Sequence, residues 1–149
     1  SIAQAAVTQF GVVPPLPRSR DEVAYLRGPQ VMQAFARGMP LLETGEYKVH
    51  ASRREAAGEA EVHTRDTDII YVLDGSVTFV TGGTVVDPRT TGPDEVRGSR
   101  IEGGTARALS KGDVIVVPAG VPHWFSQVDE PFLYYVVKSA AAETARGTR

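Results

Sequence analysis

Two apolar stretches that each carry ionisable side chains constrain this chain most. Residues 61–75 read EVHTRDTDIIYVLDG, and residues 112–127 read GDVIVVPAGVPHWFSQ. Runs rich in Val and Ile that are bounded by Gly, Pro and Asp are typical of β-strands. The hydrophobic pattern of these strands does not need the ionisable groups, so the groups predict a site.

In the first stretch, Glu61 and His63 are two residues apart, so both side chains point to the same face of a strand. Their Cα atoms then lie roughly 6.5–7 Å apart, which lets both side chains reach one ion. Asp68 opens an apolar run that ends in Asp-Gly at residues 74–75, a hairpin-type signal.

In the second stretch, Pro-Ala-Gly at residues 118–120 ends the strand predicted over residues 114–117. His123 lies just beyond this turn, where a new strand begins. A carboxylate, an imidazole, a second carboxylate and a second imidazole are thus available to one site.

The two stretches resemble the two motifs of the cupin superfamily. The first cupin motif has a His-x-His pair, then a Glu followed by six residues and a Gly. Here Glu61 and His63 stand in the places of the pair, Asp68 stands in the place of the Glu, and Gly75 closes the motif.

The second cupin motif reads Gly, five residues, Pro-x-Gly, two residues, His, three residues and Asn. The matching residues here are Gly112, Pro118, Gly120, His123 and Gln127, with Gln in place of Asn. The resemblance extends over residues 45–138. It is specific for the fold and weak for the reaction, because one fold hosts many chemistries.

The resemblance implies an all-β fold: a cupin jelly-roll β-barrel of the small, single-domain, bacterial RmlC-like kind, with a short N-terminal helical segment. We expect an N-terminal arm and short helices that pack on the barrel in residues 1–40. The cupin domain then takes residues 41–138, and residues 139–149 form a C-terminal tail.

Within the arm, Ser19 and Glu22 fit a capping box, which predicts a short helix that ends near Arg27. Pro29 suits the first turn of a second helix. That helix is expected to end at Gly38 and to act as a lid or buttress on the barrel.

The resemblance also implies one divalent metal ion held by Glu61, His63, Asp68 and His123. If Asp68 does not reach the ion, two histidines and one carboxylate remain, a pattern with open positions that suits Fe(II). Mn(II) and Zn(II) accept the same N/O ligands, so the metal stays open among Fe, Mn and Zn. Asp68 would then be a candidate catalytic base.

The alternative is that these four side chains form a hydrogen-bonded polar cluster inside the barrel without a metal. We favour the metal because two buried carboxylates beside two imidazoles are unfavourable unless their charge is neutralised.

Four further residues are expected to line a substrate pocket: Phe125, Gln127, Tyr134 and Tyr135. Gln127 either binds a substrate or finishes a strand. Only one of Tyr134 and Tyr135 can face the pocket, because neighbours on a strand point to opposite faces, and the sequence does not say which. Trp124 alternates away from the site, which favours a packing role.

In the strand predicted over residues 46–54, Val49 and Ala51 share one face, and Lys48 and His50 share the other. We expect His50 to look outward or toward a partner surface.

Two segments look like surface structure. Residues 53–55, Arg-Arg-Glu, are expected to be a solvated strand end. Residues 84–104 are rich in Gly, Pro, Thr and charge, which predicts a long loop with a short strand near residues 96–101. This loop either shapes the mouth of the pocket or is a surface hairpin.

Composition excludes several classes of function. A net charge of −2, from 16 basic and 18 acidic residues, leaves no electrostatic footprint for nucleic acid or an acidic membrane. The chain has no cysteine, so disulfides and thiolate metal sites are excluded. No apolar run approaches the ~18–20 residues that span a bilayer.

The partners expected are a small-molecule ligand or substrate and a second copy of the chain. The apolar N-terminal arm has no sheet of its own, which favours a homodimer. Cytoplasmic location is the default expectation, and a signal peptide removed upstream of Ser1 would make the protein secreted or periplasmic.

The leading hypothesis is a metal-dependent enzyme that acts on a small oxygen-bearing organic molecule, as an isomerase, a lyase or a dioxygenase. The alternative is a non-catalytic cupin that binds or senses a small ligand. A structural cupin stabilised by dimerisation is the third reading, and the single short domain argues against it.

Overall fold

The computed structural model describes residues 22–140, which form one helix and thirteen strands. The strands form two large antiparallel sheets and one small one. The first sheet has the order β1-β2-β13-β4-β11, with β1 Met39–Glu43, β2 Tyr47–Arg54, β13 Phe132–Ala140, β4 Asp66–Asp74 and β11 Val114–Val117. The second has the order β10-β5-β12-β3-β8-β7, with β10 Thr105–Ser110, β5 Ser76–Thr81, β12 His123–Val128, β3 Ala60–His63, β8 Glu95–Gly98 and β7 Arg89–Gly92.

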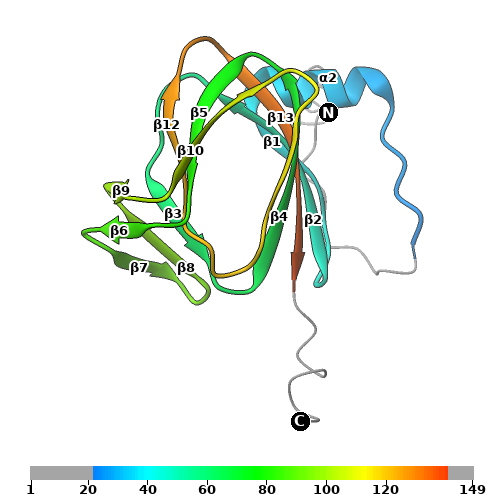
Figure 1. The fold of residues 1–149 in the computed structure, drawn as a ribbon. Coiled ribbons are helices and arrows are strands. Elements are labelled where there is room, and N and C mark those ends of the chain that lie inside the picture. Colours follow the sequence, from blue (N-terminus) through cyan, green and yellow to red (C-terminus); the bar gives the residue numbers. More distant parts are fainter. Residues whose placement is uncertain (1–21, 141–149) are drawn as a thin grey trace, which may run out of the picture.

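The two large sheets curve around a common interior (Figure 1). Their inward residues form one apolar core that includes Ile70, Val72, Phe79 and Phe132, each at most 1% exposed. The prediction of an all-β barrel with a short N-terminal helical segment is therefore confirmed. Within residues 22–140, no helix has the length and apolar character to cross a membrane.

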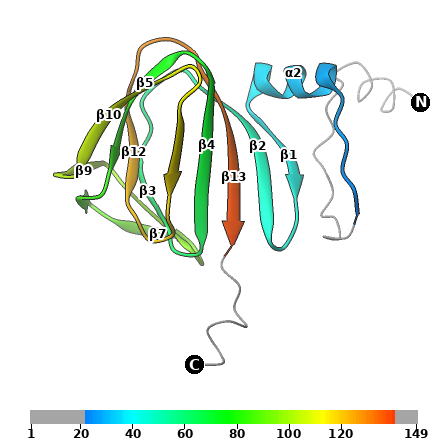
Figure 2. The same cartoon turned by 45° about the vertical axis from the view of Figure 1, so that its right-hand side comes forward.

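Helix α2, Gly28–Arg37, packs on the outside of the first sheet, beside β1 and β2 (Figure 2). It carries Pro in its first turn, and it ends at Gly38, whose φ of 70° suits glycine and whose N–H donates to Ala34 O at 2.8 Å. This is the second helix expected from the sequence.

The short helix expected before Arg27 is wrong for residues 22–27, which are not helical; Ser19 lies outside the described residues. Val23 and Tyr25 are 91% and 83% exposed in this segment. A helix as short as this needs a surface to pack on, and these side chains have none there.

Because α2 covers the outer face, the apolar side of β2 points outward, toward the helix. Ala51 is 1% exposed in a cluster with Ala34 and Phe35 of the helix. The polar side of β2 therefore faces the interior of the barrel, so the outward placement expected for His50 is wrong.

The Asp-Gly signal at residues 74–75 is a corner between the sheets and not a hairpin, because β4 and β5 belong to different sheets. Gly75 has a φ of 83°, and a Cβ there would lie 2.3 Å from the carbonyl oxygen of Pro131. Glycine is thus required both by the backbone conformation and by the close approach.

The long loop expected over residues 84–104 is wrong, since this segment forms four short strands. They are β7, β8 and the small sheet of β6 Thr84–Val86 with β9 Arg100–Glu102. The strand expected near residues 96–101 is present as β8 and β9. Strand β8 pairs with β3, in a register that sets Arg97 opposite Glu61 and Glu95 opposite His63. The segment therefore supplies charged residues to the interior of the barrel.

Candidate metal centre and its pocket

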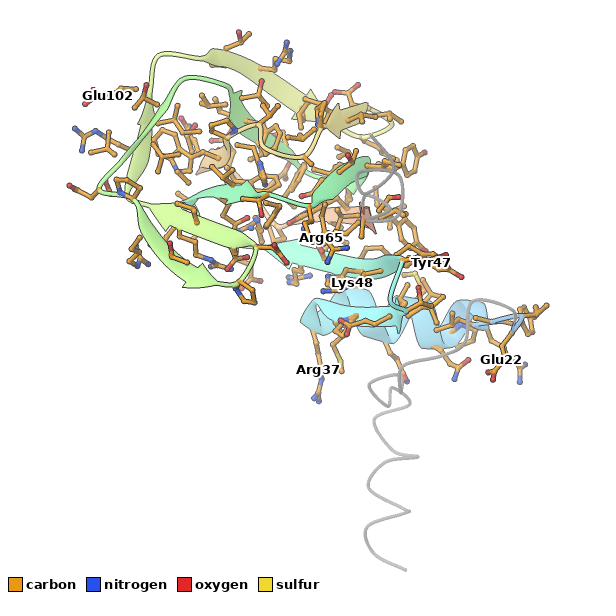
Figure 3. All side chains as sticks on the ribbon, turned by 90° about the horizontal axis from the view of Figure 1, so that it is seen from below. Glu22, Arg37, Tyr47, Lys48, Arg65 and Glu102 are labelled. Carbon is orange, nitrogen blue, oxygen red and sulfur yellow. The ribbon has the colours of Figure 1, made fainter. Side chains whose placement is uncertain are left out.

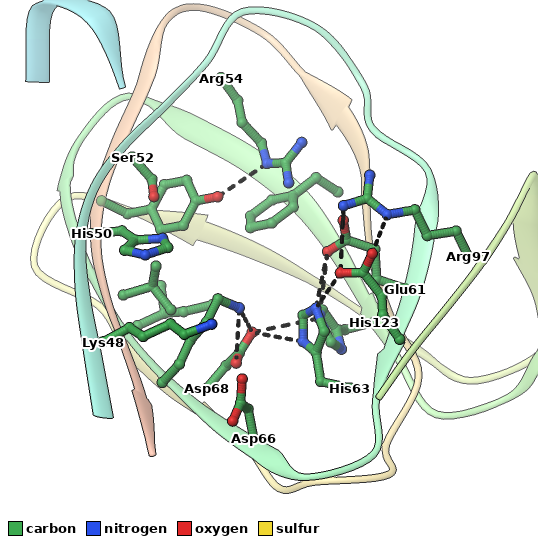
Figure 4. A pocket seen from close by; sticks show the side chains of 16 residues that line it. Lys48, His50, Ser52, Arg54, Glu61, His63, Asp66, Asp68, Arg97 and His123 are labelled. Carbon is green, nitrogen blue, oxygen red and sulfur yellow. Dashed lines mark hydrogen bonds and ion pairs between the residues drawn. The ribbon is translucent and has the colours of Figure 1, made fainter. Parts of the chain in front are cut away.

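A cavity of about 360 Å³ lies inside the barrel between the two large sheets. Figure 4 shows that His50 and Ser52 from β2 point into the same cavity as His63 from the other sheet. The cavity falls within the size range of small-molecule sites, roughly 300–1,000 Å³.

The cavity holds a group of three candidate metal ligands: Glu61, His63 and His123. One ligand atom from each lies within 4.8 Å of the others. Glu61 Oε2 lies 3.9 Å from His63 Nε2 and 3.8 Å from His123 Nε2. Strand pairing produces this group, because β3 carries Glu61 and His63 on one face and sets Glu61 opposite His123 of β12.

His123 is oriented for coordination. Its Nδ1 lies 3.0 Å from the carbonyl oxygen of Val121. Because a carbonyl oxygen can only accept a hydrogen bond, Nδ1 carries the proton, and Nε2 of the neutral ring carries the lone pair. That Nε2 is buried and has no hydrogen-bond partner within residues 22–140. Burial lowers the pKa of His123, which favours the neutral, ligating form.

Glu61 divides its two oxygens between two tasks. Oε1 lies 3.3 Å from the Arg97 guanidinium, while Oε2 faces both imidazoles. An outer partner of this kind orients a ligating carboxylate. The buried, unpartnered Nε2 of His123 and this two-nitrogen, one-oxygen donor set fit a divalent ion.

Asp68 lies next to this group but is tied to another partner. Lys138 Nζ is 3.1 Å from both carboxylate oxygens, and Asp68 Oδ2 also lies 3.4 Å from His63 Nδ1 and 3.6 Å from His123 Nε2. Burial raises the pKa of Asp68, but the interaction with His63 and the positive charge of Lys138 outweigh it and hold the pKa below its ordinary value. Asp68 is therefore an ionised, paired carboxylate.

Three charged residues that contact the candidate ligands or Asp68 were not predicted from the sequence: Glu95, Arg97 and Lys138. Glu95 Oε2 lies 3.4 Å from His63 Nε2, and a hydrogen bond from Arg97 lowers the pKa of Glu95 to about 2. The available signals were the Glu-x-Arg alternation at residues 95–97 and a lysine that follows an apolar strand. Neither signal names its partner, which depends on pairing between distant strands.

The far side of the cavity is built by Arg54, Phe125 and Tyr134. The Arg54 guanidinium lies 4.3 Å from the centre of the Phe125 ring, and its Nε donates to Tyr134 Oη at 3.1 Å. Arg54 is thus a wall of the cavity, and the solvated strand end expected over residues 53–55 is wrong for this residue.

Two residues expected in the pocket lie elsewhere. Tyr135 points to the outer face, where its ring meets Phe35 of α2 edge to face at 4.8 Å. Gln127 is exposed, and its Nε2 donates to Asp129 Oδ1 at 2.7 Å. Trp124 packs away from the cavity, as expected, and donates from Nε1 to Gly58 O.

A second hollow of about 390 Å³ adjoins the cavity and shares His63, Glu95 and Lys138 with it. Tyr47, Lys48 and Arg65 line it at the lower end of the barrel, the end seen in Figure 3.

Comparison with known proteins identifies the fold family. The family model described as cupin matches residues 34–147. No curated protein sequence matches the chain.

Solved structures share the fold. BH2720 from Bacillus halodurans is 12% identical with a TM-score of 0.57, over 83% of this chain and 86% of that one. The cupin domain of Cnp3 from Schizosaccharomyces pombe is 13% identical with a TM-score of 0.54, over 75% and 68%. KdgF from Halomonas sp. is 19% identical with a TM-score of 0.51, over 72% and 81%. At these identities the likeness shows the fold alone.

Proposed function

This chain belongs to the cupin family, and on that premise we propose that it is a metal-dependent enzyme acting on a small oxygen-bearing organic molecule. The observation that carries the proposal is the buried Nε2 of His123, which has no hydrogen-bond partner among residues 22–140 and faces Glu61 Oε2 inside the cavity. The reaction is of isomerase, lyase or dioxygenase type.

In this proposal Glu61, His63 and His123 hold one divalent ion, Fe, Mn or Zn. A divalent ion there supplies a Lewis acid that polarises a substrate oxygen. The chain contributes the orientation of the ligands, through the Val121 carbonyl behind His123 and the Arg97 guanidinium behind Glu61.

We assign Asp68 to positioning rather than to proton transfer. A general base works best with a pKa near the working pH, and the pKa of Asp68 is held below its ordinary value. Its carboxylate holds Lys138 in the cavity and contacts His63 Nδ1, so it fixes both side chains. Asp68 has two other candidate roles, fourth metal ligand and catalytic base. The metal content and turnover of Asp68→Asn distinguish them.

The second candidate is a cupin that binds a small ligand and does no chemistry. One observation favours it: four acidic and four basic side chains line the cavity, so their formal charges balance without an ion. The acidic ones are Glu61, Asp66, Asp68 and Glu95, and the basic ones are Lys48, Arg54, Arg97 and Lys138.

Metal analysis separates the two candidates. Protein purified without a histidine tag is analysed for Fe, Mn and Zn, then stripped, reloaded with each ion in turn and desalted. The metal-dependent proposal expects about one ion per chain. If the protein retains none of the three ions in any trial, the metal-dependent proposal is wrong and the ligand-binding cupin remains.

We also propose that the protein is a homodimer. Ile69, Tyr71, Val114 and Val116 are 40–62% exposed on neighbouring strands β4 and β11, and β11 is an edge strand. An exposed apolar edge is a template for pairing with another chain. A second copy could bury this edge against its own, since the same patch is self-complementary in a two-fold dimer.

A further inference from the structure

Arg54 is a cavity residue whose charge is not matched by any carboxylate of the described residues 22–140. Among residues 22–140 its side chain makes one hydrogen bond, from Nε to Tyr134 Oη, and no ion pair. A guanidinium has five N–H donors, so four remain for another partner. A cation that is held in a cavity without a counter-ion is a recognition group for an anion.

The guanidinium is also held in place. It lies over the Phe125 ring at 4.3 Å, and Phe125 is 4% exposed. A Cβ on Gly58 would lie 2.6 Å from Arg54 Nη1, so glycine leaves the guanidinium its space. A guanidinium that is held by stacking and by one hydrogen bond loses little further conformational entropy when it binds a ligand.

The other cations nearest to the three candidate ligands are already paired. Arg97 contacts Glu61 at 3.3 Å, and Lys138 contacts Asp68 at 3.1 Å. Because the charges lining the cavity balance, a bound divalent ion would leave an excess of two positive charges. An anionic substrate removes this excess. Among residues 22–140, Lys48 and Arg54 are the two cavity cations without an ion pair; Lys48 is exposed, whereas Arg54 is held in place by Phe125 and Tyr134.

We infer that Arg54 binds the oxyanionic group of a small organic acid whose other oxygen reaches Glu61, His63 and His123. Figure 4 shows Arg54, Glu61, His63 and His123 around the same cavity, so one small molecule can contact the guanidinium and the candidate ligands together. The inference rests on the proposed function for the role of that second oxygen. Carboxylate and phosphate share the chemistry that a guanidinium recognises in a bidentate manner.

The test uses the metal-free full chain labelled with ¹⁵N, and follows the Nε–Hε resonances of its arginines by NMR. The probes are lactate, malonate and gluconate, each compared with its neutral match: lactamide, malonamide and sorbitol. Inorganic phosphate forms a separate arm. We expect a carboxylate to shift the Arg54 resonance in a saturable manner while its neutral match does not, and a response to phosphate alone assigns the oxyanion as phosphate.

The matched pair of variants is Arg54→Gln and Arg53→Gln. Arg53 is the neighbouring residue, but it pairs with Glu55 at 2.8 Å. We expect Arg54→Gln to weaken binding roughly 10–100-fold, as for the loss of charge-assisted hydrogen bonds, and Arg53→Gln to leave it unchanged. Circular dichroism and the melting temperature check that both variants fold, and Tyr134→Phe tests the neighbouring hydroxyl without removing the charge.

Equal affinity in wild type and Arg54→Gln, or no response to any anion, overturns the inference. Metal content is measured in the same variants. Arg54→Gln is expected to retain as much metal as wild type, so a failure of anion binding is distinguishable from a failure of the metal site.

Discussion

Lys138 places its ammonium nitrogen 3.1 Å from both carboxylate oxygens of Asp68. The two residues are cross-strand partners on β13 and β4, and their side chains are 18% and 5% exposed. A buried carboxylate whose two oxygens both contact one lysine ammonium has its charge compensated within the protein. The pair therefore explains how Asp68 stays ionised inside the barrel.

The first prediction is that Asp68→Asn retains stoichiometric metal. Asp68 lies outside the group of three candidate ligands, so its charge is not needed to hold the ion. The measurement is the metal content of the desalted protein, with exposed Asp74→Asn on the same strand as the control.

Loss of metal from Asp68→Asn would instead make Asp68 a fourth ligand. Retained metal with turnover reduced about 10²–10⁴-fold would make it a catalytic base.

His123→Ala is expected to abolish stoichiometric metal binding. It removes one of two imidazoles in the group, leaving one nitrogen and one oxygen donor. The matched control is His50→Ala, which removes an imidazole from the same cavity but outside the group. Full metal occupancy in His123→Ala, or equal loss in both variants, would contradict the assignment.

Glu95 makes stability depend on pH in a defined window. Its folded pKa is about 2, below the ordinary 4.5, so its contribution is complete above pH 4.5 and is lost as the pH falls toward 2. We expect Glu95→Gln to lower the free energy of unfolding by about 1 kcal/mol at pH 6, because solvent screens a side chain that is 30% exposed.

Urea unfolding of both proteins at pH 6 and pH 2.5 measures this difference, which should shrink at the lower pH. A difference that stays constant between the two pH values would mean that the carboxylate charge of Glu95 does not stabilise the fold.

Light scattering at micromolar concentration is expected to give the mass of a dimer for the wild type. Val116→Lys places a charge in the exposed apolar patch and should give a monomer with an unchanged fold. Val23→Lys, at an exposed site outside the patch, is the control. A monomeric wild type, or a Val116→Lys dimer, would count against the proposed interface.

Much of the fold and the three candidate metal ligands follow from local sequence. Glu61 and His63 share a face because the side-chain period of a strand is two. His123 follows a Pro-x-Gly turn that opens a strand, and the structure brings it to within 3.8 Å of Glu61. The helix that ends at Gly38 was also visible, because its proline and glycine act on the backbone beside them.

What only the tertiary structure decided is which face of each strand looks inward and which charges meet. Alternation separates Tyr134 from Tyr135 and His50 from Val49, but the docking of α2 on the outer face determines which of them enters the cavity. A two-residue period separates the two faces of a strand but does not say which face points inward, so local sequence leaves both orientations open.

Long-range strand register set the charge partners. Lys138 meets Asp68 across 70 residues, and β8, within a segment that reads as a loop, brings Arg97 to Glu61. The sequence by itself determined the strands that carry Glu61, His63 and His123 and the turn before His123, because these depend on neighbours along the chain. The tertiary structure determined the place of Arg54 in the cavity wall and the partners of the carboxylates. Side chains far apart in sequence meet only once both sheets have closed around the cavity.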